Sequence, residues 1–252
     1  HKVCCPQGKQ TRLPSKRQAP PATRLRRPGG ASRQKTLDKR SNAQYTMPST
    51  QKGIDSMKEN FDSLFDPAII RDTIAFYETR DRWQEILNYR KLTAETGHVD
   101  NLFYGDSITD IWPLHEFFPN HSLLNRGIGG DNVHGLYYRL HDDVYPYTPK
   151  RVFILIGING IEQEKQLIID RTRAVAQLIK ERGSEVWLGS ILPLRHPDAW
   201  DRFQYQSKIV EINAEQAEWS RANLDGYLDY HSLLKDAEGQ LAAEYARPDG
   251  TT

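Results

Sequence analysis

The residue types of a serine hydrolase gather first around Ser107. This serine lies in the segment Gly105-Asp106-Ser107-Ile108, directly after an apolar run over 101–104. Ester hydrolysis needs a nucleophile, a base that takes its proton, and hydrogen-bond donors for the oxyanion. Open α/β sheets place such groups in the turns that follow their strands. Ser107 is therefore the candidate nucleophile, and the alternative is a plain helix-capping turn with Asp106 or Ser107 as the N-cap.

A glycine loop, Gly127-Ile128-Gly129-Gly130-Asp131, follows the next apolar run. Glycines let backbone N–H groups approach a substrate closely, so the Gly130 N–H can serve as an oxyanion donor. A dinucleotide-binding loop is the rival interpretation. It fails on spacing, because Asn132 occupies the position where Gly-x-Gly-x-x-Gly requires its third glycine.

The third motif, Gly157-Ile158-Asn159-Gly160, follows the continuous apolar run 151–157. The side-chain NH₂ of Asn159 can donate to the same oxyanion, although a Gly-x-Asn segment alone is most often only a turn. Each of the three motifs follows a successive predicted strand. We therefore expect Ser107, Gly130 and Asn159 to converge at one edge of a parallel sheet.

The elements that would position these residues alternate between strand and helix from about residue 61. Strands are predicted over 99–104, 122–125, 151–157, 185–191 and 226–230. Helices are predicted over 80–96, from the end of the glycine loop to Leu140, over 167–179 and over 205–219. Repeated strand–helix–strand units imply parallel strands with helices on both faces. The predicted fold is a flavodoxin-like three-layer α/β/α sandwich with a five-stranded parallel sheet, in one domain over 57–252.

The first 56 residues differ in composition from the rest of the chain. They contain 13 of the 34 basic residues but only 2 of the 33 acidic ones, with little apolar periodicity. This composition predicts a disordered basic tail or a translated stretch outside the true gene. Nucleic-acid binding is not expected, because no aromatic residues are interleaved with the charges.

Three further observations bear on the compartment. The only two cysteines, Cys4 and Cys5, lie in this tail, so neither a disulfide framework nor a thiolate metal site is expected in the body. No apolar run approaches the roughly 18 residues of a spanning helix. The sequence begins at His1 with its first methionine at Met47, so the true start and any export signal are open. The compartment and the oligomeric state therefore stay unassigned.

These motifs resemble the GDSL/SGNH hydrolase family, whose four blocks centre on Ser, Gly, Asn and a paired Asp and His. The glycine loop is very similar to that of platelet-activating-factor acetylhydrolase catalytic subunits and their bacterial relatives, and a helix like 80–96 is common in the bacterial acylhydrolase branch. The resemblance implies that Ser107 is the nucleophile. It also implies an oxyanion hole formed by the Ser107 and Gly130 amides and the Asn159 side chain, with no metal or cofactor.

The last block departs from the family pattern. Asp249 fits the aspartate that orients the catalytic histidine, but the histidine position is Thr252, whose hydroxyl cannot act as a base near neutral pH. Family members also continue past this histidine into a terminal helix. We interpret the departure as a chain cut or frame-shifted at this point. Among the other histidines, only His196, after the fourth predicted strand, is a candidate stand-in.

The resulting expectation is a serine esterase or acylhydrolase that cleaves small acyl esters, with acetyl esters favoured, through an acyl-Ser107 intermediate. Candidate substrates are O-acetylated carbohydrates and lysophospholipids. Aromatic and hydrogen-bonding surface near the site is expected from Trp112, Arg195, Trp200 and Tyr205. The activity of this chain is expected to be impaired. Two alternatives stay open, a non-catalytic binding module of the same fold and an interaction protein that acts through its basic tail.

Overall fold

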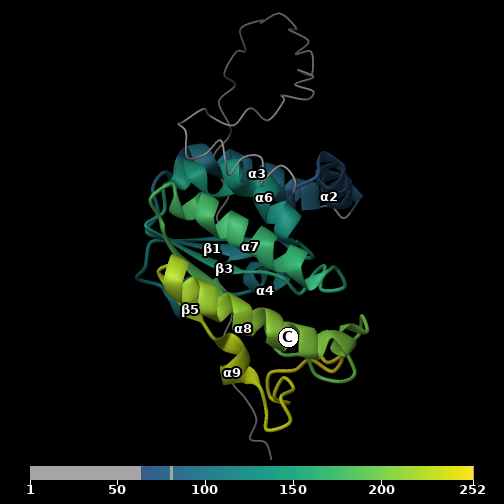
Figure 1. Ribbon diagram of the computed structural model, residues 1–252. Coiled ribbons are helices and arrows are strands. Elements are labelled where there is room, and N and C mark those ends of the chain that lie inside the picture. The colour runs from purple at the N-terminus through teal and green to yellow at the C-terminus, as the bar shows by residue number, and fades with distance from the viewer. Residues whose placement is uncertain (1–63, 80–81, 252) are drawn as a thin grey trace, which may run out of the picture. The chain divides into compact units, whose positions relative to one another are not determined.

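A five-stranded parallel sheet forms the centre of the computed structural model, which describes residues 64–79 and 82–251 (Figure 1). The strand order is β2-β1-β3-β4-β5, the flavodoxin-like order. The strands are β1 (Asn101–Gly105), β2 (Leu123–Gly127), β3 (Arg151–Leu155), β4 (Glu185–Gly189) and β5 (Gly226–Leu228). Each predicted strand is present, which confirms the predicted fold class.

Three predicted strands extend too far at their carboxyl ends. Residues such as Ile156 and Ile191 continue the apolar runs of β3 and β4, yet they lie in buried loops beyond the last paired residues. Both side chains line the cavity at this edge of the sheet and form part of its apolar wall. Apolar runs alone therefore overestimate strand length where a buried loop follows.

One face of the sheet carries the main core. Alternate strand residues point to opposite faces, and Leu102, Tyr104, Val152, Ile154 and Leu188 all join one buried cluster. The helices that cover this face include α6 (Val133–Asp143) and α7 (Lys165–Lys180), which supply buried residues to the same cluster. The helix α8 (Gln206–Asn223) packs against α7 and β5.

The opposite face carries a row of half-buried aromatic side chains. Phe103 stacks on Phe153 with ring centroids 4.8 Å apart, and Phe153 lies beside Trp187 of β4. Trp112 and Phe118 pack against Phe103 from the segment that contains the short helices α4 (Ser107–Asp110) and α5 (Leu114–Phe117). This layer completes the three-layer α/β/α arrangement.

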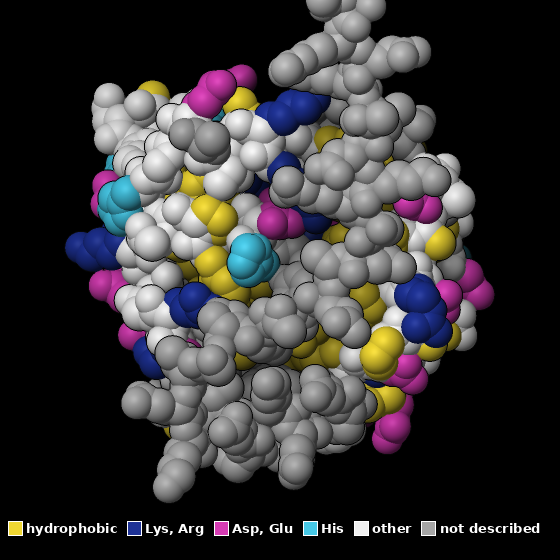
Figure 2. All heavy atoms as spheres, turned by 90° about the horizontal axis from the view of Figure 1, so that it is seen from above, with side chains coloured by type: hydrophobic (Ala, Val, Ile, Leu, Met, Phe, Trp, Pro, Cys, Tyr) yellow, Lys and Arg dark blue, Asp and Glu magenta, His cyan; other side chains and the backbone are white. Residues whose placement is uncertain are grey.

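Two helices precede the sheet in sequence and pack beside α6. The helix α3 (Arg82–Thr96) matches the predicted helix 80–96 over the described residues. The helix α2 (Pro67–Thr79) was not predicted as a separate element. The Asp66 carboxylate accepts a hydrogen bond from the Ala68 amide at the start of α2, as an N-cap residue does. On the face shown in Figure 2, acidic and basic side chains of the described residues are interspersed.

The remaining short helices are η1 (Tyr145–Tyr147), η2 (Arg202–Tyr205) and α9 (Tyr230–Leu234). Within the described ranges, no helix is both long enough and apolar enough to cross a membrane. The predicted tail over 1–56 and Thr252 lie outside the residues that the structure describes.

Candidate active site

Ser107 is the first residue of α4, separated from the end of β1 only by Asp106. The Asp106 carboxylate accepts a hydrogen bond from the Ile108 amide at 3.0 Å and so caps this helix. A Cβ atom at Gly105 would lie 2.3 Å from the Leu155 carbonyl oxygen, so the strand end requires glycine. The segment is thus a helix cap, and it also brings Ser107 to the wall of a cavity.

The glycine loop packs directly against α4. A Cβ atom at Gly127 would lie 2.1 Å from the Asp110 amide nitrogen, a contact that only glycine permits. The Tyr89 hydroxyl of α3 donates to the Gly127 carbonyl at 3.0 Å. Gly130 adopts a φ of 79°, in the left-handed region that favours glycine. The loop is therefore held beside the Ser107 helix in a conformation set by its glycines.

Asn159 contributes from the loop after β3. Its Nδ2 donates to the Asp131 carbonyl at 2.8 Å, and its Oδ1 accepts from the Arg202 guanidinium at 3.4 Å. These contacts orient the amide, with its NH₂ group toward the glycine loop. A carboxamide NH₂ has two hydrogens, so the Asp131 bond leaves one for a ligand.

Ser107, Gly130 and Asn159 line one cavity of about 580 Å³ at the carboxyl edge of the sheet. This is the convergence that the sequence predicts for groups that follow successive parallel strands. Apolar walls come from the loops after β3 and β4. Among the described residues that line this cavity there is no histidine.

The segment that contains Asp249 lies beside the cavity, but the Asp249 carboxylate does not line the cavity. Asp249 accepts hydrogen bonds from the amide and hydroxyl of Thr251, which lower the pKa of the carboxyl. Thr251 is buried and does line the cavity. Gly250 has a φ of 82°, and a Cβ atom there would lie 1.9 Å from the Pro197 carbonyl oxygen. The final described residues therefore pack tightly on the loop after β4.

Comparison with known proteins agrees with this arrangement. The model of the GDSL-like Lipase/Acylhydrolase family matches residues 103–250. The chain belongs to this family. Its members are ester hydrolases, and the match runs from within the strand before Ser107 to the residue after Asp249.

Among its relatives is the human platelet-activating factor acetylhydrolase IB subunit alpha2, which is 30% identical over 122 residues. That alignment covers 46% of this chain and 53% of the human protein, so the chain spans about half the length of the relative. Human subunit alpha1 is 28% identical over 165 residues, with 62% of this chain and 67% of that protein covered.

Many solved structures share the fold. One, from Streptococcus pneumonia and provisionally described as a platelet activating factor, has a TM-score of 0.63 at 25% identity, and covers 74% of this chain and 92% of its own. A GDSL-like lipase from Bacteroides thetaiotaomicron has a TM-score of 0.58 at 23% identity, with 66% and 89% covered.

Of the four residues that we expected to form a surface near this GDSL-family site, only Trp200 lines the cavity, with 67% of its surface exposed. Trp112 packs instead against Phe103 on the half-buried sheet face. The Arg195 guanidinium forms an ion pair with Asp236 at 2.8 Å. This ion pair connects the C-terminal segment to the loop after β4. Tyr205 packs against the buried cluster between α7 and α8.

His196, the candidate stand-in for a catalytic histidine, does not line the cavity. It is exposed and packs edge-on against Phe203.

Phe76 and Arg202 are among the cavity residues that were not anticipated from the sequence. Phe76 of α2 lines the cavity and lies 3.1 Å from the position of a Cβ atom on Gly130. Arg202 binds the Asn159 amide oxygen and lies over the Trp200 ring at 4.9 Å. The spacing of Ile69, Thr73 and Phe76 on one helical face is the signal that could have revealed α2. Nothing local in the sequence marks Arg202.

Asp106 is the buried ionisable group next to the nucleophile. Burial raises the pKa of its carboxyl to about 7, while the hydrogen bond from the Ile108 amide opposes this rise. The protonation of this carboxyl therefore changes close to neutral pH.

Proposed function

We propose that the protein is a serine esterase that cleaves small acyl esters through an acyl-Ser107 intermediate. The observation that carries the proposal is the meeting of Ser107, Gly130 and Asn159 in one cavity. These are the positions that carry the nucleophile and two oxyanion donors in the family that the sequence resembles.

In the proposed reaction, Ser107 Oγ attacks the carbonyl carbon of the ester, and its proton passes through solvent water to the oxygen of the departing alcohol. The amides of Ser107 and Gly130 and the Nδ2 of Asn159 donate to the oxyanion of the tetrahedral intermediate. Collapse of the intermediate breaks the ester C–O bond and releases the alcohol. Water then attacks the acyl-serine, its oxygen stays with the acid that is released, and one of its protons restores the Ser107 hydroxyl.

We propose further that this chain performs the reaction slowly. The position three residues after Asp249 is Thr252, and no histidine lines the cavity among the described residues. Loss of one member of a Ser-His-Asp unit lowers kcat by a factor of about 10⁴ to 10⁶. The residual rate enhancement comes from substrate binding and from the oxyanion hole.

The substrate class proposed is an acetyl or other short acyl ester. The cavity combines apolar walls with the exposed ring of Trp200 and the guanidinium of Arg202, which suits an acylated sugar that stacks on an aromatic ring. A lysophospholipid is the second candidate, in keeping with the platelet-activating factor acetylhydrolase relatives.

Trapping of the intermediate tests the proposed function. The chain is incubated with nitrophenyl acetate, quenched with acid and digested, and the peptide that contains Ser107 is examined for an acetyl adduct. We expect the adduct on Ser107 and none in Ser107→Ala. Acetylation spread over surface lysines, with none on Ser107, would reject the proposed nucleophile.

A non-catalytic binding module is the second candidate function, favoured by the lack of a histidine among the described cavity residues. It predicts binding of acetylated oligosaccharides without turnover, whereas the esterase predicts Ser107-dependent release of acetate.

A further inference from the structure

A buried carboxylate follows Gly130 directly in sequence. The Asp131 side chain is 1% exposed. Its Oδ1 accepts hydrogen bonds from the Tyr77 hydroxyl at 2.6 Å and from the Asn132 amide at 2.9 Å. Its Oδ2 accepts from Arg139 Nε at 3.0 Å and from a terminal nitrogen of the same guanidinium at 2.6 Å. Both oxygens of this carboxylate are therefore fully engaged.

The backbone of Asp131 links the same residue to the opposite wall of the site. Its carbonyl oxygen accepts the Asn159 Nδ2 at 2.8 Å, and its amide donates to the Ile128 carbonyl at 3.1 Å. A shift of Asp131 would thus displace the Gly130 amide and the Asn159 side chain together.

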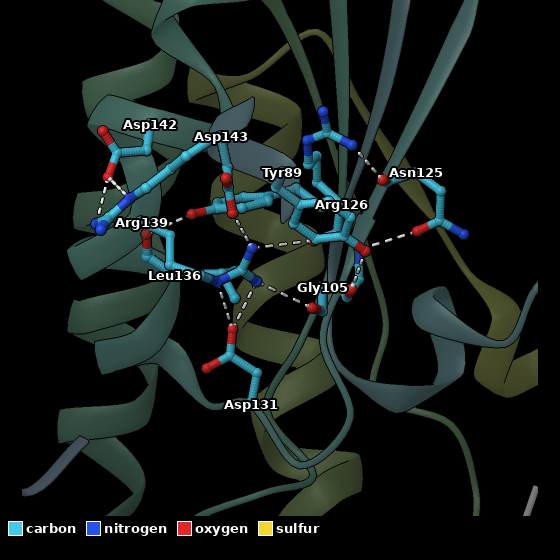
Figure 3. A network of polar contacts seen from close by, with 12 residues as sticks. Tyr89, Gly105, Asn125, Arg126, Asp131, Leu136, Arg139, Asp142 and Asp143 are labelled. Carbon is cyan, nitrogen blue, oxygen red and sulfur yellow. Dashed lines mark hydrogen bonds and ion pairs between the residues drawn. The ribbon is translucent and has the colours of Figure 1, made fainter. Parts of the chain in front are cut away.

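Arg139 of α6 extends this connection to the nucleophile side. Besides Asp131, its guanidinium donates to the Arg126 carbonyl at 3.2 Å and to the Gly105 carbonyl at 3.4 Å (Figure 3). Arg126 precedes the glycine loop, and Gly105 lies two residues before Ser107. The planar guanidinium of Arg139 therefore binds three places at once. It binds the backbone before Ser107, the backbone before the glycine loop, and the Asp131 side chain directly after Gly130.

The charge state suits this role. Burial alone would lower the pKa of Arg139, but the neighbouring Asp131 and Asp143 carboxylates raise it well above its ordinary value, so the guanidinium stays charged. Buried ion pairs are weak sources of stability, since apolar replacements are often as stable. What the guanidinium supplies that an apolar side chain cannot is several hydrogen bonds in fixed directions.

The helix that carries Arg139 leaves room for these contacts at one position. A Cβ atom on Gly135 would lie 1.6 Å from Asp131 Oδ1 and 2.0 Å from the Tyr77 hydroxyl oxygen. Glycine is otherwise unfavourable inside a helix. Its presence allows α6 to approach the carboxylate closely enough to be bound.

We propose that Asp131 and Arg139 are positioning residues that align the oxyanion hole, acting through the Gly130 amide and the Asn159 side chain. The inference rests on the proposed function, because it assigns those two donors to the oxyanion. It predicts that loss of the Arg139 guanidinium loosens the segment 127–132 while the remote strand β4 stays ordered.

Amide hydrogen exchange of the full chain tests this proposal. The variants are Arg139→Met, which removes the guanidinium, and Arg139→Lys, which keeps the charge but not the planar donors. The control is Arg90→Met, because Arg90 pairs with Asp142 of the same helix at 2.6 Å but is about one-third exposed. We expect Arg139→Met to raise exchange in 127–132 at least tenfold without changing β4, Arg139→Lys to raise it less, and the control to change neither segment.

Kinetics supply a second readout. On nitrophenyl acetate we expect Arg139→Met to lower the Ser107-dependent kcat about 100-fold with little change in KM, and Arg139→Lys to restore part of it. If Arg139→Met does not fold, Arg139→Lys and Asp131→Asn carry both measurements.

The two hypotheses fail differently. Exchange in 127–132 that is unchanged, or that rises only in step with β4, would overturn the positioning role whatever the activity. Hydrolysis that persists in Ser107→Ala would reject the proposed function, and the exchange result would then show only whether the pair orders the loop.

Discussion

Ser107 illustrates how one short segment serves two purposes. The Asp106 carboxylate caps α4, and the same turn places the serine at the cavity wall. The capping interpretation and the catalytic interpretation are therefore compatible. What distinguishes a candidate site from a plain turn is that the neighbouring loops bring Gly130 and Asn159 to the same cavity. Asn159 is similar, because its amide binds the Asp131 carbonyl and also faces the cavity.

Asn159 gives the first prediction at this scale. Asn159→Ala removes one oxyanion donor and one hydrogen bond to the glycine loop, so the Ser107-dependent rate on nitrophenyl acetate should fall about 100-fold or more. The matched control is Asn223→Ala at the exposed end of α8, where the amide binds only the Trp219 carbonyl. Equal rates for both variants would remove Asn159 from the oxyanion hole.

Asp106 gives the second prediction, which concerns pH. Its folded-state pKa of about 7 exceeds the value of about 3.9 in an unfolded chain. Between these values the folded protein holds a proton that the unfolded chain has lost, so stability falls as pH rises through this window. Asp106→Asn keeps the cap acceptor but cannot ionise. We expect it to melt higher than the parent at pH 8 and close to it at pH 4, and a difference independent of pH would contradict the assignment.

At the scale of elements, sequence reasoning succeeded where the signal is local. The apolar runs predicted all five strands, because strands buried on both faces are rich in apolar residues. The same runs misplaced the ends of β3 and β4, since Ile156 and Ile191 belong to the cavity wall.

Contacts between distant elements escaped prediction. The Tyr77 hydroxyl meets Asp131 across 54 residues of sequence, and Arg202 meets Asn159 across 43. No local pattern encodes such partners. A local signal exists for one contact within α6. Arg139 and Asp143 lie one helical turn apart and interrupt an apolar face, which favours a buried ion pair between them.

The close approach of α6 to Asp131 gives an element-scale prediction. Gly135→Ala would gain about 1 kcal/mol of helix propensity, but its methyl group would overlap the Asp131 carboxylate. Overpacking of this kind costs about 1–3 kcal/mol or more. Calorimetry should therefore show a lower melting temperature, and an unchanged or higher value would mean that the helix can shift without loss.

At the scale of the whole molecule, the described residues from α2 to Thr251 contribute to the fold and the site, and the basic segment 1–56 lies outside the residues that the structure describes. Its composition predicts disorder. Limited trypsin digestion should remove it up to about Lys58 and leave the melting temperature of the remainder unchanged. Protection of the arginines at 24, 26 and 27 would contradict this prediction.

We propose that Ser107 is the nucleophile of an ester hydrolase and that no histidine among the described cavity residues serves as its base. The most direct test is nitrophenyl acetate hydrolysis by the chain, by Thr252→His, and by the Ser107→Ala version of each. We predict a slow hydrolysis that Ser107→Ala abolishes, and a faster, equally Ser107-dependent hydrolysis in Thr252→His, because the histidine supplies the missing base. Hydrolysis that is the same with and without Ser107 in both backgrounds would contradict the claim.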